Sequence, residues 1–355
     1  MTTLLVTGGA GFIGSNFLRL LAVERHFRLI VIDALTYAGN LASIQELVDG
    51  DKVVFVLGDI RDAQVVKNVF TRYRVDQVIH FAAESHVDRS ILGPRTFVDT
   101  NVNGTLNLLM AAHEQWQSNV EGNRFLHVST DEVYGALSAE DPPFSETTPY
   151  APTSPYSASK AASDHLVRAW YHTYGFPAVI TNCSNNYGPW QFPEKLIPLM
   201  ILNAVEGKQL PVYGDGLQVR DWLHVRDHCE ALRVILERGI AGETYCIGGN
   251  NEQPNIRIVE TICDLVDQRV GRPEGTARRL VRHVEDRPGH DRRYAIDANK
   301  LKSELGWSPR FEFQTALSDV VDWYLSHDNW VETIRSGEYL GFYERQYAHR
   351  IKGAS

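Results

Sequence analysis

The sequence has few cysteines, and their positions exclude two classes of small, cross-linked protein. They are Cys183, Cys229, Cys246 and Cys263, and no two of them form a Cys-x-x-Cys pair. This spacing disfavours both a zinc site and a disulfide framework. We therefore expect reduced, structural cysteines, a cytoplasmic protein and no bound metal.

An excess of positive charge and long apolar runs are also lacking. The chain has 35 Lys and Arg against 44 Asp and Glu, a formal charge of -9. This balance gives no general attraction to nucleic acid or to an anionic membrane, so a bound anion needs a local basic site. No apolar run approaches membrane-spanning length, and the N-terminus lacks the basic region of a signal peptide.

What the chain does have is length and an ordinary globular composition. Its 355 residues are 43% hydrophobic, enough for one large α/β body or for two lobes. The first 187 residues show alternating strand and helix patterns, and the alternation is less regular beyond them.

A glycine-rich turn opens the chain. Gly8, Gly11 and Gly14 follow a predicted strand at 4–7 and precede apolar residues at helical spacing. Such glycines allow a tight turn and a close approach of the backbone to a pyrophosphate at the helix N-terminus. A second predicted strand, 29–32, ends in Asp33, whose carboxylate can accept both ribose hydroxyls and repels a 2′-phosphate. The pattern predicts NAD rather than NADP, and the alternative is a glycine turn with an incidental Asp.

Two further strand ends complete the predicted cofactor site. Asp59 follows a strand at 53–57, where the adenine edge would lie, but it could equally cap the next helix. Ala82 and Ala83 follow a strand at 78–81, and their small side chains let a cofactor lie against the backbone.

Two adjacent carboxylates, Asp131 and Glu132, follow the predicted strand at 125–128. Strand ends of an open parallel sheet present chemistry, and close carboxylates resist joint ionisation, which can leave one as acid and one as base. Because strand side chains alternate in direction, both acids reach one substrate only if the backbone turns there. The alternative is a solvated loop.

Tyr156 and Lys160 are four residues apart at the start of a helical pattern, so they share one face. An ammonium beside a phenol lowers the pKa of the phenol and makes it a usable base. Taken alone, this pair is more often structural.

Six arginines crowd into 278–293, and Arg220 precedes them in the chain. Many of them will be solvated, but this group is the best local candidate for a diphosphate site.

Together these motifs resemble the extended short-chain dehydrogenase/reductase family. Within it, Thr-Asp-Glu-Val-Tyr-Gly (130–135), Tyr-Ser-Ala-Ser-Lys (156–160), Asn-Asn-Tyr-Gly-Pro (185–189), Arg-Asp-Trp-Leu-His-Val (220–225) and Arg-Pro-Gly-His-Asp-Arg-Arg-Tyr (287–294) are similar to those of dTDP-glucose 4,6-dehydratases. The resemblance runs from residue 4 to about residue 325. The tail after it departs from the family pattern.

The resemblance implies a Rossmann-type doubly wound parallel sheet with a smaller α/β substrate-binding lobe. Residues 1–187 would form the NAD-binding part, with about 221–248 returning to it, 188–330 mainly the sugar-nucleotide lobe, and 331–355 a tail of no assigned role. A homodimer is also implied, with the helical stretches 94–116 and 156–174 packing against those of the partner.

It also implies a set of site residues. The catalytic ones are Thr130, Asp131, Glu132, Tyr156 and Lys160. The NAD-binding ones are Gly8, Gly11, Phe12, Ile13, Gly14, Asp33, Thr36, Asp59, Ile60, Phe81, Ala82, Ala83, Ser85, Thr100, Tyr156, Lys160 and Asn186. The substrate-binding ones are Ser85, His86, Thr130, Asn185, Lys195, Leu196, Pro211, Tyr213, Arg220, Asn255, Arg287, His290 and Tyr294.

The activity so implied is NAD-dependent dehydration of dTDP-glucose to a 4-keto-6-deoxy sugar nucleotide, in deoxysugar biosynthesis. Tyr156 would act as base at C4, Glu132 as base at C5 and Asp131 as acid toward the C6 hydroxyl, and the hydride taken from C4 would return to C6. Two alternatives stay open. One is an epimerase or decarboxylase of another sugar nucleotide, and the other is a non-catalytic NAD-sensing regulator.

Overall fold

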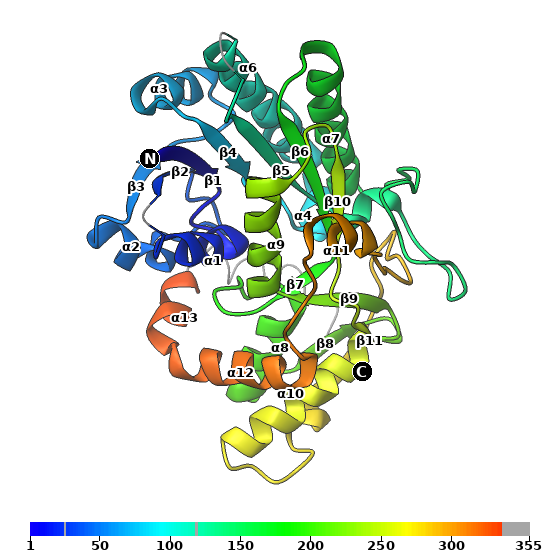
Figure 1. Cartoon of the computed structure of the whole chain (residues 1–355). Coiled ribbons are helices and arrows are strands. Elements are labelled where there is room, and N and C mark those ends of the chain that lie inside the picture. Colours follow the sequence, from blue (N-terminus) through cyan, green and yellow to red (C-terminus); the bar gives the residue numbers. More distant parts are fainter. Residues whose placement is uncertain (25, 118–119, 336–355) are drawn as a thin grey trace.

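A seven-stranded parallel sheet organises the computed structural model, which describes residues 1–24, 26–117 and 120–335 (Figure 1). The strand order is β10-β6-β5-β4-β1-β2-β3, and every neighbouring pair is parallel. The strands are β1 (Thr2–Thr7), β2 (Phe27–Asp33), β3 (Val53–Leu57), β4 (Gln77–His80), β5 (Arg124–Thr130), β6 (Ala178–Cys183) and β10 (Thr244–Ile247). This confirms the predicted doubly wound sheet.

Helices cover both faces of this sheet because its strands are apolar on both sides. Leu4 and Val6 pack in one buried cluster with Phe17, and Leu5 packs in another with Leu108. On the first face lie α1 (Phe12–Leu21), α2 (Gln45–Asp49), α9 (Val225–Arg238) and α11 (Asn299–Leu305); on the second lie α3 (Ala63–Tyr73), α6 (Thr105–Trp116) and α7 (Pro155–Tyr174). The carboxyl ends of the strands stay uncovered by these helices.

A second lobe lies beyond those carboxyl ends (Figure 1). Its buried core joins α8 (Leu196–Glu206), α10 (Asn255–Arg269), α12 (Phe313–Ser326) and α13 (Asp328–Ile334). Its strands are β8 (Leu210–Tyr213) with β12 (Val281–Val284), and β7 (Asn185–Tyr187) and β11 (Glu252–Pro254) on either side of β9 (Val219–His224). Between β9 and β11 the chain returns to the large sheet through α9 and β10.

The short elements are α4 (Val87–Leu92), α5 (Pro94–Phe97), the π-helix η2 (Val98–Gly104) and the 3₁₀ turns η1 (Leu41–Ser43), η3 (Asp131–Tyr134) and η4 (Ala277–Leu280). None of the helices in the described part of the chain is both long and apolar enough to cross a membrane. All four cysteines are buried free thiols, as the sequence predicted.

The long helix predicted at 94–116 is not one regular α-helix. It runs as α5, the π-helical η2 and α6. Inside the π-helical turn, the buried Asn101 accepts a bond from the Glu84 backbone N–H (2.8 Å) and donates to the Glu84 carbonyl (3.0 Å). A wider helical turn lets this side chain reach a neighbouring segment, and such turns are frequent at functional sites.

One of the two alternative roles of Asp59 is excluded. Asp59 does not cap α3; Asp62 does, because its Oδ1 accepts the backbone N–H groups of Gln64 (2.9 Å) and Val65 (3.1 Å). Asn255, implied above as a substrate-binding residue, is the first residue of α10, and Pro254 holds the cap position without a side-chain bond. β9 ends at His224, and α9 begins at the next residue, Val225.

The cap of α3 yields a stability prediction. Asp62→Ala removes the acceptor for two otherwise unpaired helix N–H groups, so we expect a loss of about 1 kcal/mol in the free energy of unfolding. Asp62→Asn removes the same charge but keeps an acceptor, and it should retain most of that stability. Urea unfolding of the three proteins measures this, and equal losses in Asn and Ala would show that charge rather than capping matters.

Candidate active site

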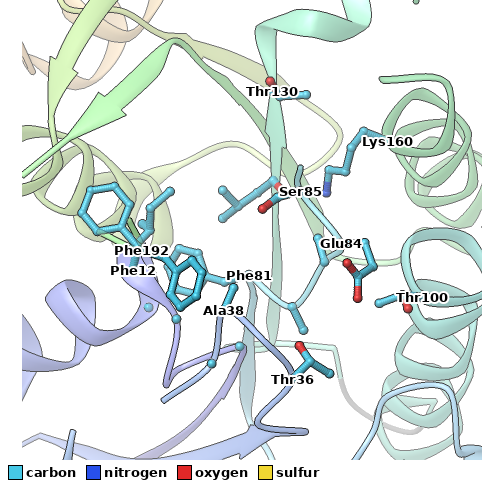
Figure 2. Close-up of a pocket in the computed structure, with 18 of the residues that line it drawn as sticks. Phe12, Thr36, Ala38, Phe81, Glu84, Ser85, Thr100, Thr130, Lys160 and Phe192 are labelled. Atoms are coloured by element: carbon cyan, nitrogen blue, oxygen red, sulfur yellow. Dashed lines mark hydrogen bonds between the residues drawn. The ribbon is translucent and has the colours of Figure 1, made fainter. Parts of the chain in front are cut away.

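A cavity of about 430 Å³ lies at the carboxyl ends of β1, β4, β5 and β6. Figure 2 shows Phe12 and Phe192 on one side of it and Glu84 and Thr100 on the other, with Lys160 and Thr130 farther along. All the residues predicted to bind NAD and all five predicted catalytic residues line this one cavity. It brings together segments as far apart as Gly8 and Lys195.

The glycine-rich turn is shaped to receive a group against its backbone. Gly8 has a φ of +70°, and a Cβ there would lie 2.6 Å from the backbone nitrogen of Ala82. A Cβ at Gly14 would lie 2.3 Å from the Gly8 carbonyl oxygen. No side chain caps α1 at Gly11, so the first turn of the helix presents its N–H groups toward the cavity. These features fit the pyrophosphate of a dinucleotide.

Asp33 ends β2 at the wall of the cavity. Its Oδ2 accepts the Ala10 N–H (2.9 Å) and its Oδ1 accepts the Leu35 N–H (2.8 Å). Burial raises the pKa of Asp33, and these two backbone bonds offset part of that rise. Each oxygen keeps a further lone pair, so the fixed carboxylate fits a ribose diol. Asp59 also lines the cavity and is held by Arg61 Nη2 at 2.6 Å.

The backbone turns where the two neighbouring acids require it. β5 ends at Thr130, whose hydroxyl accepts the Glu132 N–H (3.3 Å), and a 3₁₀ turn follows. Gly135 ends that turn at a φ of +90°, and a Cβ there would lie 2.5 Å from the Ala151 carbonyl oxygen. The turn brings Asp131 and Glu132 to the same cavity.

The surroundings of Asp131 and Glu132 shift the pKa values of their two carboxyl groups differently. Burial raises the pKa of Asp131 well above its usual range, and the charges of Glu132 and Asp221 raise it further. Asp131 Oδ2 is buried and has no partner among the described residues. Burial also raises the pKa of Glu132, but the cations Arg287, Lys195 and Arg220 counteract that rise. Burial and two like charges thus favour the neutral form of Asp131, while three cations favour the charged form of Glu132.

Tyr156 and Lys160 share one face of α7 and line the cavity, as predicted. The predicted lowering of the tyrosine pKa is wrong for this chain. Burial raises the pKa of Tyr156 well above 10, and the charge of Glu132 raises it further, while the Thr130 hydroxyl acts in the opposite sense. Lys160 is also buried, and its Nζ donates to the Val128 carbonyl (2.9 Å). Desolvation of the phenol therefore sets the direction of its pKa shift.

The predicted substrate residues fall into two groups. Ser85, Thr130, Asn185 and Lys195 line the cavity itself. The remaining ones, which do not, are His86, Leu196, Pro211, Tyr213, Arg220, Asn255, Arg287, His290 and Tyr294. Lys195 Nζ donates to the Ser85 carbonyl (2.9 Å), so the two lobes meet at this point of the cavity wall.

Two of the arginines predicted as an anion site act on Glu132, Arg220 from a buried position and Arg287 from a half-buried one. Arg220 stacks on Tyr294 at 4.2 Å and donates to the Asp291 carbonyl (2.8 Å). Arg287 Nη1 lies 3.5 Å from Asp88 Oδ1, and its Nε has no partner in the described structure. Four of the others pair at the surface or bond to carbonyls: Arg278 with Asp264, Arg292 with Asp215, Arg293 with Glu252, and Arg282 with backbone oxygens. The fifth, Arg279, is exposed.

Sequence reasoning missed three residues that shape the site. Asn101 fixes the Glu84 backbone and donates to Ser159 Oγ (2.8 Å). Phe192 forms part of the cavity wall, and Glu194, also in the wall, accepts from Arg89 Nε (3.2 Å). Burial raises the pKa of Glu194 to about 7. No local pattern marks these residues, and only the position of Glu194 beside Lys195 could have drawn attention to it.

Known proteins share this architecture. The family profile described as GDP-mannose 4,6 dehydratase matches residues 5–320. A dTDP-glucose 4,6-dehydratase of Xanthomonas campestris pv. campestris is 58% identical over 344 residues, which cover 96% of this chain and 97% of that protein.

Solved structures agree with this at the level of the fold. DesIV, a dTDP-glucose 4,6-dehydratase from Streptomyces venezuelae solved with NAD bound, has a TM-score of 0.86 at 45% identity, over 94% of this chain and 100% of that one. The UDP-glucose 4-epimerase of Thermus thermophilus, solved with NAD, has a TM-score of 0.82 at 28% identity, over 92% and 100%. The profile match and the identity to curated relatives lead to one conclusion: the chain belongs to the GDP-mannose 4,6-dehydratase family of sugar-nucleotide enzymes.

Proposed function

We propose that this protein is an NAD-dependent 4,6-dehydratase that converts dTDP-glucose to dTDP-4-keto-6-deoxyglucose in deoxysugar biosynthesis. The observation that carries the proposal is the pair Asp131 and Glu132, turned onto one cavity and separated in pKa by their surroundings. The curated relative at 58% identity and DesIV at 45% identity support dTDP-glucose over the GDP-mannose of the family description. Epimerization needs no acid and base placed for the loss of water, so the pair also argues against that alternative.

Each residue has a separate task in this mechanism. When bound, NAD would supply a positively charged nicotinamide ring that accepts the hydride. Tyr156 takes the proton of the C4 hydroxyl, and to do so it must be a phenolate. Burial keeps the phenol neutral in the chain alone, so its deprotonation depends on the positive charges of Lys160 and of the nicotinamide ring. Lys160 and Thr130 orient that phenol.

The elimination falls to the two acids. Once C4 is a ketone, the proton at C5 is acidic, and Glu132 removes it as a carboxylate supported by Arg287, Lys195 and Arg220. Asp131, which burial keeps protonated, gives its proton to the departing C6 hydroxyl. One carboxyl group thus begins charged and the other neutral, which elimination of water requires.

The division of labour is tested at Asp131. Asp131→Asn is nearly isosteric but has no proton to give, so oxidation at C4 should proceed and elimination should stall. With dTDP-glucose, the variant should accumulate the absorbance of reduced nicotinamide, while turnover falls by about 10² to 10⁴, the usual contribution of a positioned general acid. Tyr156→Phe, which impairs the first step, should show little of that absorbance.

The wild type provides the reference for this experiment. Its product from dTDP-glucose in deuterated water should carry deuterium at C5, because Glu132 exchanges its proton with solvent. UDP- and GDP-linked hexoses should turn over more slowly. Near-normal turnover of Asp131→Asn, or a product without deuterium at C5, would mean that the carboxylate pair does not perform the elimination.

The substrate diphosphate is assigned to Arg220 and Arg287, because both act on Glu132 from the second lobe in a chain of net negative charge. Charged hydrogen bonds to phosphate contribute roughly 1.5 to 3 kcal/mol, so Arg220→Ala should raise KM about tenfold or more. Arg292→Ala is the matched control, since Arg292 is exposed and pairs with Asp215. Initial rates against dTDP-glucose measure both, and equal KM values in the two variants would remove Arg220 from the substrate site.

We also propose a cytoplasmic homodimer. Apolar side chains are exposed on the helical stretches that would meet the partner: Val98 on η2, Met110 on α6 and Tyr174 on α7. The four buried free thiols suit a reducing compartment. Sedimentation equilibrium at micromolar concentration should give twice the chain mass of 40.0 kDa, and Met110→Glu should shift the protein toward monomer. A wild-type monomer under these conditions would contradict the proposal.

A further inference from the structure

The last described helix, α13, belongs to the core of the second lobe but lies against the cofactor side of the first. Figure 1 shows α13 below α1, and α13 contacts the 3₁₀ turn η1 (Leu41–Ser43) of the first lobe. Trp330 Nε1 on α13 donates to Ser43 Oγ at 3.1 Å, and both side chains are buried. A second, longer bond joins Asn40 Nδ2 to Thr333 Oγ1 at 3.5 Å. Residues 287 positions apart in the chain thus form a buried polar contact.

The turn that Trp330 holds is bonded to two walls of the cofactor cavity. The Asn40 N–H donates to the carbonyl of Ala10 in the glycine-rich turn (3.1 Å). The Ala10 N–H donates in turn to Asp33 Oδ2 (2.9 Å). Gly39 lies so close that a Cβ there would be 2.7 Å from Asp33 Oδ1. A displacement of the 40–43 turn therefore displaces both the phosphate-facing turn and the ribose carboxylate.

The other side of the Trp330 ring is fixed within the second lobe. Its ring centroid lies 5.3 Å from that of Trp190 and 5.2 Å from that of Trp323. The neighbouring Tyr324, fully buried on α12, donates its hydroxyl to the Gln191 carbonyl (2.6 Å), and Gln191 lines the cavity. α12, which packs against α13, therefore holds a second part of the cavity wall in place.

We propose that α13 holds the cofactor-side turn 40–43 in place, and that Trp330 and Ser43 are positioning residues that slow the loss of NAD. The inference rests on the proposed function, because it assigns the cavity to NAD. Neither residue touches the cavity; both act through Asn40 and Ala10 on the groups that do. The hydride taken at C4 returns to C6 of the same sugar, so the dinucleotide must stay bound through the whole cycle.

The test is the rate at which the purified protein releases a bound dinucleotide. Protein loaded with etheno-NAD is mixed with excess NAD, and the change in fluorescence gives the dissociation rate without substrate or turnover. Trp330→Phe keeps an aromatic ring but loses the N–H, and Ser43→Ala loses the acceptor. Each should raise the dissociation rate by about three- to tenfold, the usual effect of one lost buried hydrogen bond. The double variant should be no faster than either single one, since both remove the same contact.

Two controls separate this inference from a general loss of stability and from the cofactor assignment itself. Trp116→Phe also removes a buried indole bond, from Nε1 to the Val75 carbonyl (2.8 Å), but lies away from the cavity. It should leave the dissociation rate unchanged. Asp33→Ala should raise that rate whether or not α13 matters.

The outcomes are distinguishable. If Asp33→Ala has no effect, the cofactor assignment fails. If Asp33→Ala releases etheno-NAD faster while Trp330→Phe does not, the cofactor assignment stands and the role of α13 is overturned. Additive effects of Trp330→Phe and Ser43→Ala, or an equal effect of Trp116→Phe, would also overturn it.

Discussion

The burial of two neighbouring carboxyl groups is the constraint on which the site depends. A buried charge is costly unless it is paired, and two adjacent carboxylates cannot both stay charged without nearby cations. The fold answers this by keeping the cations on the second lobe: Arg220, Arg287 and Lys195 all act on Glu132. Arg220 also lowers the pKa of Asp131, but burial and the charges of Glu132 and Asp221 raise it well above its usual range. The two carboxyl groups therefore differ in their electrostatic surroundings because the two lobes meet around them.

The cofactor side of the cavity depends on close backbone approach rather than on charge. Gly8 and Gly14 leave no room for a Cβ, and the sheet order places Ala82 against the same turn. Asp33 is held by two backbone N–H groups before any ligand arrives. Preorganisation of this kind reduces the ordering cost of binding. It also makes the site sensitive to whatever holds the surrounding turns.

Most of the sheet and of the cofactor wall could be predicted from the sequence, because their signals are local. The glycine spacing, Asp33 at a strand end, and Tyr156 four residues before Lys160 each require only a short segment and its periodicity. The sequence could predict the turn after Thr130 only as a condition for the site. Side chains alternate in direction along a strand, so Asp131 and Glu132 can face one substrate only if the backbone turns there. The residue types alone then gave the chemistry, while the resemblance gave the roles.

The remaining features depend on contacts between distant segments. The predicted direction of the Tyr156 pKa shift was wrong. Burial raises this pKa, and burial is not visible in an i, i+4 spacing. The π-helical turn that aims Asn101 at Glu84 breaks a pattern that reads as one helix. Burial among distant segments raises the pKa of Glu194 to about 7, even though the nearby cations Lys195 and Arg89 lower it.

The same argument explains why α13 had no predicted role. Its sequence carries no motif, and a tryptophan at this place predicts only an ordinary core residue. One side of the Trp330 ring does pack in the core of the second lobe. Only the three-dimensional structure shows that the indole N–H reaches Ser43 and, through it, a turn bonded to Ala10 in the glycine-rich turn. An enzyme that exchanges its cofactor at every turnover gains nothing from such a contact, because release is part of its cycle. A reaction that takes a hydride from one carbon and returns it to another on the same sugar is impaired whenever the cofactor leaves between the two steps. Retention of the dinucleotide is therefore a requirement of the proposed chemistry, and a contact distant from the reacting atoms can serve it without touching either ligand.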